Sequence, residues 1–239
     1  MRTALFSAVV GLGCVAPVVR ADVMTIPSSL TGGFDAFGGY SNTLAFQNYF
    51  TGSTATGPQP DRRSFFIFEL PPMPPVISAS LVLRNPWVPF PVGDDGTPGY
   101  FSDDAFETFR LSDTPFPAPY IASPHTTPEA LGIWATLGSG TLFGEADVFP
   151  ASGPEEDLVI PLTGAALAAI NAHLGSFFVM GGQVSSLDGT SPDELIFGYS
   201  DIPSPHMVEP RLSLTFIPAP SAAVALGGAA LVGLGRRRR

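Results

Sequence analysis

Short apolar segments, separated by glycine and proline, follow one another through the middle of the chain. Residues 76–84 show the clearest pattern, because apolar and polar side chains alternate there with the two-residue period of a β-strand. One predicted face carries Ile77, Ala79, Leu81 and Leu83, and the other carries Ser78, Ser80 and Arg84. The segment Arg211–Phe216 alternates in the same way, so both segments are predicted to be strands with one buried face.

Further strands and one helix complete the predicted set. The other strands are Ser64–Leu70, Phe106–Leu111, Gly140–Val148, Asp157–Leu162, Ser176–Val184 and Leu195–Tyr199. Thr163 is a predicted helix N-cap and Gly175 ends that helix. The proline-rich segments Pro86–Ser102 and Pro115–Ile133 predict loops. The pattern therefore predicts an all-β protein, a single antiparallel β-sandwich with one short helix.

Two apolar runs lie outside this predicted sandwich, one near each end of the chain. Arg2 precedes the apolar run Ala4–Val19, and Val19-Arg20-Ala21 is a small-residue cleavage site, so residues 1–21 predict a secretory signal peptide. Near the other end, the segment Ile217–Gly235 is 19 residues long, enough to cross a bilayer about 30 Å thick. The predicted body is residues 22–216.

The C-terminal segment has three parts in a fixed order. A proline motif comes first, then the apolar run, and then a basic cluster that holds the chain on the cytoplasmic side of a membrane. The motif is Pro218, Ala219, Pro220 and Ser221, and the cluster is Arg236, Arg237, Arg238 and Arg239. Residues 217–239 resemble the PEP-CTERM sorting signal of exported bacterial proteins, with Ala219 in place of the usual glutamate. The resemblance implies recognition by an exosortase-type sorting enzyme, transient anchoring in the membrane, and a final location at the cell surface or in the extracellular (biofilm) matrix.

The body also resembles a family, through the order of its strands. Ser64–Pro71 leads into Ile77–Arg84, Leu158–Thr163 enters the short helix, and Pro210–Phe216 closes the set. This order is similar to the secreted jelly-roll modules of the DNRLRE and carbohydrate-binding-like group. The resemblance implies a jelly-roll sandwich and does not imply a ligand.

The charge of the body narrows the classes of partner. Only five basic residues, all arginine, lie within residues 22–216, against all 21 acidic residues of the chain, so the body has a formal charge of −16. Such a surface repels nucleic acid. The single cysteine, Cys14, lies in the predicted signal peptide, so a mature protein without this peptide has no thiol for a disulfide or for catalysis.

Signals of enzymatic chemistry are weak. The three histidines, His125, His173 and His206, form no metal-binding pair in the sequence, and no serine lies in a Gly-x-Ser-x-Gly elbow. His173 is expected to be structural at the end of the predicted helix, and His125 and His206 are expected to be solvated in loops. We therefore expect a protein without enzymatic activity and with a structural or adhesive role.

Acidic residues gather in one predicted loop. Asp94, Asp95, Asp103 and Asp104 lie there, with Glu107 and Asp113 just beyond. Because Ca²⁺ prefers several oxygen ligands, this loop is a candidate for a structural Ca²⁺ site, although its spacing is not that of an EF-hand. The alternative is a solvated acidic loop without an ion. A glycosidase pair would also need two carboxylates facing each other, which spacing does not indicate.

Aromatic residues lie in the same insertion. Trp87, Tyr100 and Phe101 are candidate contacts for a glycan, because exposed rings stack on sugars. The alternative is that these rings cap the core, which we favour for Trp134. A module that binds extracellular polysaccharide is thus the second functional hypothesis, from a different class than the structural role.

Overall fold

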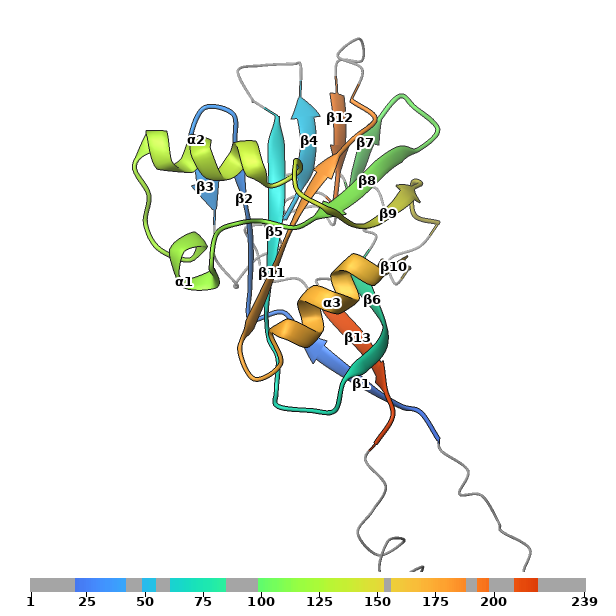
Figure 1. Ribbon diagram of the computed structural model, residues 1–239. Coiled ribbons are helices and arrows are strands. Elements are labelled where there is room, and N and C mark those ends of the chain that lie inside the picture. The colour runs from blue at the N-terminus through green and yellow to red at the C-terminus, as the bar shows by residue number, and fades with distance from the viewer. Residues whose placement is uncertain are drawn as a thin grey trace, which may run out of the picture.

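The computed structural model describes residues 20–41, 49–54, 61–84, 99–152, 156–187, 193–197 and 209–218. The fold is mostly β, with two antiparallel sheets (Figure 1), so the predicted all-β class is confirmed. Nearly all of the predicted signal peptide and C-terminal segment lies outside the described residues. Among the described helices, none is long and apolar enough to cross a membrane.

The smaller sheet joins the first and last strands of the body. Its order is β1-β13-β6-β10. Its strands are β1 (Asp22–Pro27), β13 (Arg211–Phe216), β6 (Val76–Arg84) and β10 (Asp157–Pro161). Asp22 pairs with Phe216 and Pro27 with Arg211, so the start of β1 and the end of β13 lie side by side at the lower end of Figure 1.

The larger sheet has the order β7-β12-β4-β5-β11-β8-β9, and β2 pairs with both β5 and β3. Its strands are β2 (Leu30–Asp35), β3 (Tyr40–Ser41), β4 (Thr51–Thr54), β5 (Arg62–Glu69), β7 (Tyr100–Ser102), β8 (Glu107–Ser112), β9 (Leu142–Val148), β11 (Phe177–Val184) and β12 (Asp193–Ile196). Strands β4, β7 and β12 lie at one end of the molecule, and the start of β1 and the end of β13 lie at the other (Figure 1).

The main core lies between the two sheets. Alternate side chains of facing strands enter it, among them Phe66 and Phe68 of β5 and Leu81 and Leu83 of β6, each fully buried. The two-residue period of β6 and β13 that the sequence shows is the result of this one-sided burial. One position differs from prediction, because Ile77 is half-exposed and Val76 is buried instead, beside an irregularity in the β13–β6 register.

A second, smaller core covers the outer face of the larger sheet. Phe65 and Ile67 of β5 pack there against α1 (Ala118–Ile121) and α2 (Thr127–Thr136). Because helices cover the outside and the smaller sheet covers the inside, β5 buries side chains on both faces. This explains why residues 65–68 are continuously apolar rather than alternating.

The two helices of this second core correct the sequence prediction for Pro115–Ile133. We expected a loop there, and the prediction of a single helix is wrong as well. Thr126 and Glu129 form a reciprocal capping box at the start of α2, and Pro128 stands in its first turn. The prolines in this segment therefore stand at the starts of helices and do not exclude them. An N–H group in the first turn of a helix has no acceptor within the helix, so proline loses no hydrogen bond there.

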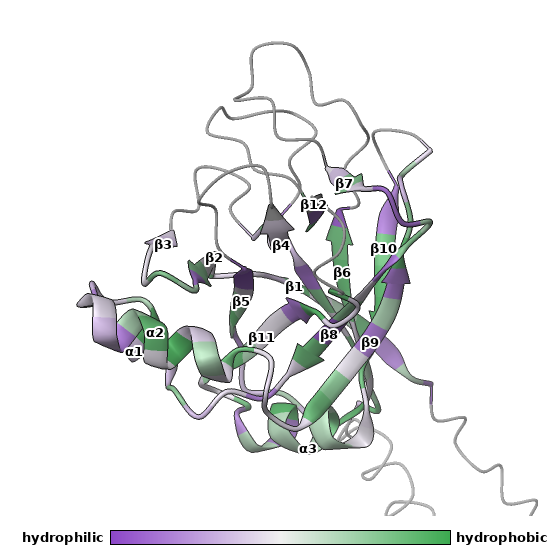
Figure 2. Ribbon diagram, turned by 90° about the horizontal axis from the view of Figure 1, so that it is seen from above, coloured by the Kyte–Doolittle hydropathy of each residue, from purple (hydrophilic) through white to green (hydrophobic). Residues whose placement is uncertain are grey.

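The predicted helix after Thr163 is confirmed as α3 (Gly164–Ala172). The Thr163 hydroxyl accepts a hydrogen bond from the Ala166 N–H at 3.3 Å and donates one to the Leu142 carbonyl at 2.9 Å. Helix α3 contacts β6 of the smaller sheet and β9 of the larger sheet, and its Ala166 and Ile170 are buried in the main core between them. Both α2 and α3 contain few hydrophilic positions (Figure 2).

The remaining strands agree with the sequence to different degrees. Strands β5, β8, β9, β10 and β11 overlap their predicted segments, and β6 and β13 coincide with theirs. Strand β12 begins two residues before the predicted Leu195–Tyr199 and ends at Ile196. Strands β1 to β4 were not predicted, and β7 lies in the segment predicted as the loop Pro86–Ser102.

Candidate functional site

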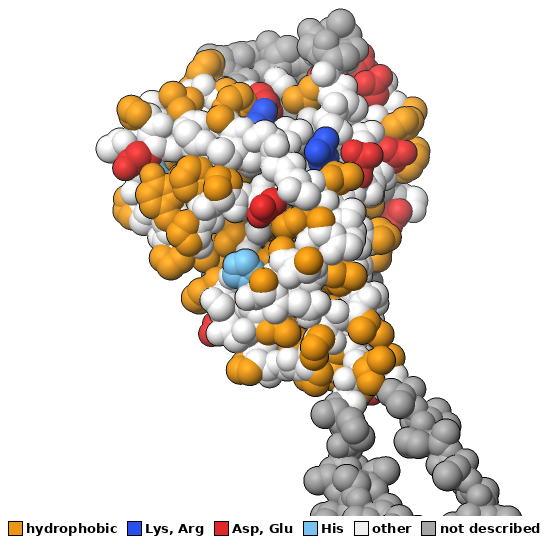
Figure 3. All heavy atoms as spheres, in the orientation of Figure 1, with side chains coloured by type: hydrophobic (Ala, Val, Ile, Leu, Met, Phe, Trp, Pro, Cys, Tyr) orange, Lys and Arg blue, Asp and Glu red, His pale blue; other side chains and the backbone are white. Residues whose placement is uncertain are grey.

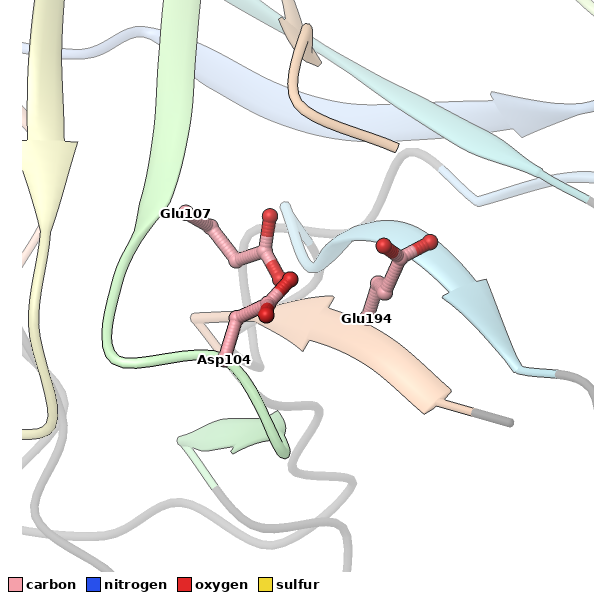
Figure 4. Close-up of side chains that lie close together, drawn as sticks. All are labelled: Asp104, Glu107 and Glu194. Atoms are coloured by element: carbon pink, nitrogen blue, oxygen red, sulfur yellow. The ribbon is translucent and has the colours of Figure 1, made fainter. Parts of the chain in front are cut away.

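Three carboxylates meet at the end of the molecule opposite the start of β1. One carboxylate oxygen from each of Asp104, Glu107 and Glu194 lies within 4.8 Å of the other two. Asp104 belongs to the turn between β7 and β8, Glu107 begins β8, and Glu194 lies on β12 (Figure 4). We call these three residues the acidic cluster.

Glu107 faces inward because of the strand that carries it. Phe109 and Leu111 point into the main core from alternate positions of β8, and Glu107 continues the same face at the end of the strand. Its side chain is fully buried. A buried carboxylate is costly unless polar groups or an opposite charge compensate it.

Serine hydroxyls hold the Glu107 carboxylate. Ser102 donates to Oε1 at 2.6 Å, and Ser186 donates a short hydrogen bond to Oε2. Ser186 also accepts from the Thr108 N–H at 2.9 Å, so its position is fixed from both sides. Both partners of the carboxylate are neutral, and within the described residues Glu107 forms no ion pair with an arginine. No opposite charge among the described residues would therefore compensate a negative charge on this carboxylate.

Tyr100 supports the turn that carries Asp104. Its hydroxyl donates to the Asp104 carbonyl oxygen at 2.9 Å. Burial raises the pKa of Tyr100 to about 12, and the nearby Glu107 adds to this rise while a hydrogen bond with Ser102 opposes it. The phenol therefore keeps its proton at any physiological pH and remains a donor.

Glu194 reaches the cluster through close pairing of three strands. Strand β12 lies between β7 and β4, with Glu194 opposite Ser102 on one side and opposite Ser53 on the other. Gly52 of β4 has φ +120°, and a Cβ there would stand 1.9 Å from the Glu194 carbonyl oxygen. Only glycine permits this approach. Glu194 is 2% exposed, so two of the three carboxylates are buried.

This arrangement suits a hard cation. Carboxylate oxygens within 4.8 Å repel one another unless a cation or a proton lies between them. Ca²⁺ binds six to eight oxygens at 2.3–2.6 Å, and the hydroxyl of Ser102 adds a neutral oxygen at the edge of the cluster. The geometry can therefore supply part of a Ca²⁺ coordination shell, with water as the remaining ligands.

The structure places the predicted Ca²⁺ ligands in different positions. Asp104 joins the acidic cluster, whereas Asp103 is exposed on the same turn outside it. Asp94 and Asp95 lie outside the described residues. Glu107, which the sequence places just beyond the loop, is part of the cluster. Glu194 was not predicted, because a lone glutamate 87 residues further along the chain carries no local signal of its position.

The predicted glycan contacts differ in their exposure to solvent. Tyr100 is 5% exposed and Phe101 is 43% exposed, so of this pair only Phe101 presents much of its ring to solvent. Trp87 lies outside the described residues. The expectation that Trp134 packs on the core agrees with its contacts to the second core.

The histidines differ from one another. The expectation of a solvated His125 is wrong, because its ring packs 5.1–5.7 Å from the rings of Phe34, Tyr40 and Tyr120. His173 follows the end of α3, where Nδ1 is 2.8 Å from the Ala169 carbonyl oxygen. His206 lies outside the described residues.

Comparison with known proteins places the chain in no family: no protein-family model matches it, and no curated protein matches its sequence.

Proposed function

We propose that this protein is exported, held in the membrane by its C-terminal segment, and then transferred to the cell surface or the extracellular matrix. The observation that carries the proposal is the pairing of β1 with β13, from Asp22 opposite Phe216 to Pro27 opposite Arg211. Because of this pairing, the residue that follows the proposed signal peptide (Asp22) and the last residue before the proposed sorting segment (Phe216) lie at the same end of the body. The rest of the sandwich then points away from the membrane.

The short connection to the apolar run supports the same orientation. Phe216 ends β13, and the apolar run begins at Ala222. Six residue steps span at most about 20 Å. An anchored body would therefore stand close to the bilayer, with β4, β7, β12 and the acidic cluster at its far end (Figure 1).

Deleting residues 218–239 tests the sorting proposal. The truncated protein should no longer reach the surface and should appear in the medium or the periplasm, as measured by cell fractionation and surface labelling. A second variant that replaces only Pro218 and Pro220 by alanine keeps the apolar run and the arginines, and it should stay in the membrane unprocessed. Unchanged surface display of the truncated protein would refute the proposal.

For the body, we infer a non-enzymatic jelly-roll sandwich with a structural or adhesive role. Support comes from its all-β architecture of antiparallel sheets, whose first and last strands are neighbours. The same role suits an acidic exterior, because a net charge of −16 keeps extracellular copies apart unless cations bridge them.

We also propose that the acidic cluster binds Ca²⁺ as a structural ion. Glu107 and Glu194 are buried, and the two hydrogen bonds of Glu107 come from neutral hydroxyls. A divalent cation would offset the repulsion among Asp104, Glu107 and Glu194 and would tie β12 to the β7–β8 turn. The rival is a cluster that stays empty, with a shared proton in place of an ion.

Thermal unfolding of the purified protein distinguishes the two. In about 100-fold excess of calcium over its dissociation constant, the ion should stabilise the fold by about 2.7 kcal/mol. The melting temperature should fall when a chelator replaces calcium. Glu194→Gln should abolish this difference, and Asp103→Asn, a change at an exposed position outside the cluster, should preserve it. Equal melting temperatures of the wild type with calcium and with chelator would contradict a structural ion.

The alternative function is binding of extracellular polysaccharide. The exposed ring of Phe101 favours it, because an aromatic face open to solvent can pack on the apolar face of a sugar. Phe101→Ala should then weaken retention on polysaccharide without changing the melting temperature. Equal retention of this variant and the wild type would remove Phe101 from the binding surface.

A further inference from the structure

A groove of about 380 Å³ lies on the outer side of the larger sheet, away from the acidic cluster. One wall consists of residues 113–119, which are the connection between β8 and α1 and the first two residues of α1. The other wall is formed by the end of α3 and the first residues of β11, including His173 and Phe177. Its size is within the range of small-ligand sites in proteins.

Three prolines give the groove a rigid wall. Pro115, Pro117 and Pro119 are exposed, while Thr114 before them and Ala118 between the last two are buried and fix the segment to the body. The ring of Phe116 stacks on Tyr120 at 5.1 Å. Because proline fixes φ, this wall loses little conformational entropy when a ligand binds.

An aromatic ring is open to solvent in the opposite wall. Phe177 is 41% exposed at the start of β11, whereas the next residue, Phe178, is buried in the main core. The backbone of Phe177 is held by its pairing with Glu69 of β5. Strand β11 therefore presents the Phe177 ring to the groove rather than to the core.

Two groups that can accept hydrogen bonds line the same groove, and neither accepts one within the described residues. Because a carbonyl oxygen can only accept, the His173 Nδ1 donates to Ala169 at 2.8 Å, which leaves Nε2 of the neutral ring as an acceptor. The Asp113 carboxylate is exposed, and within the described part of the chain it makes no hydrogen bond or ion pair. Figure 3 shows this face, with a histidine and an acidic side chain amid hydrophobic side chains.

These groups together specify a ligand with several hydroxyl donors and an apolar face. Neutral sugars have both, because their hydroxyls lie around the ring edge and their C–H groups lie on its faces. An anionic polymer is disfavoured by Asp113 and by the −16 charge of the body.

We infer that the groove between residues 113–119 and Phe177 binds a neutral polysaccharide. The inference deepens the alternative function above, on which it rests, and it moves the glycan contact from Phe101 to Phe177. The Phe177 ring packs on a sugar face, and Asp113 and His173 accept hydrogen bonds from its hydroxyls.

Native affinity electrophoresis of the full chain tests this inference, with hydroxyethyl cellulose, dextran or galactomannan in the gel. At least one of these polymers should retard the protein. Phe177→Ala should weaken the interaction about tenfold, which is the loss of one apolar contact of this size, and Phe177→Tyr should restore it. Asp113→Asn should weaken it by about threefold to tenfold, as expected for one hydrogen bond.

Phe101→Ala is the matched control, because it removes an equally exposed ring from another strand. If Phe101→Ala abolishes retardation and Phe177→Ala does not, polysaccharide binding stands and the groove inference fails. If no polymer retards the protein, both fail. If a basic proline-rich peptide binds while all three polymers do not, the groove is a peptide site and the inference is overturned. If Phe177→Ala lowers the melting temperature, its weaker binding does not test the groove. The retardation of Asp113→Asn then decides whether the groove binds the polymer.

Discussion

Arg63 joins helix α2 to the strand beneath it. Its guanidinium lies 4.2 Å from the centre of the Trp134 ring and donates to the carbonyl oxygens of Trp134 and Ala135 at 3.1 and 3.2 Å. The Trp134 indole in turn donates to the Asp61 carbonyl at 3.0 Å. Burial lowers the pKa of Arg63, and the nearby Asp61 carboxylate opposes this effect. The planar, permanently charged guanidinium of arginine suits this position better than the ammonium group of lysine.

Arg63→Lys should therefore destabilise the protein by about 1–2 kcal/mol, because lysine keeps the charge but loses the stacking and one of the two carbonyl contacts. Urea unfolding measures the change. Arg110→Lys is the control, since Arg110 makes no hydrogen bond or ion pair among the described residues, and it should change stability by less than about 0.5 kcal/mol. Equal effects of the two substitutions would show that the Trp134 contact adds nothing.

At the scale of the element, α2 shows how a helix can be missed although its signals are present. Thr126 and Glu129 have the spacing of a capping box, and Pro128 suits a first turn. Composition argued for a loop, since prolines crowd the residues before it, and the apolar positions of α2 give only a weak stripe. The burial of Ala130 and Ile133 against β2 and β5 then stabilises what local propensity leaves marginal.

The capping box predicts a pH dependence. Hydrogen bonds from the Thr126 N–H and hydroxyl lower the pKa of Glu129 below its ordinary value of 4.5. Its contribution to stability is thus fully present above that value and is lost as the pH falls through the lower folded pKa. Glu129→Gln should melt below the wild type at pH 7, and the two curves should converge near pH 2. A difference that stays constant with pH would show that the charge is irrelevant.

At the scale of the whole molecule, the two cores are separate clusters that share one strand. Phe65 and Ile67 contact the helices, and Phe66 and Phe68 contact the opposite sheet. Damage to the second core should therefore release α1 and α2 before it unfolds the sandwich.

Ile133→Ala tests this division, because Ile133 is fully buried in the second core. The loss should be about 2–5 kcal/mol locally, and hydrogen exchange should lose protection over residues 118–137 while β6 and β13 keep theirs. Leu81→Ala, an equally buried change in the main core, should lower protection throughout. Uniform loss in both variants would mean that the two cores unfold as one.

The sequence alone determined the elements whose signals are local. The alternation in Val76–Arg84 and Arg211–Phe216, and the Thr163 cap, depend on neighbours a few residues away, so a reader of the chain can find them. Tertiary structure decided what depends on distant partners. Phe65 and Phe66 have the same side chain, yet they enter different cores because α2 happens to cover one face of β5. Glu194 meets Glu107 because β12 pairs with β7, and Phe177 faces a groove because residues 113–119 cross beside it. No spacing along the chain records such meetings, since they arise from the packing of strands that are far apart in sequence.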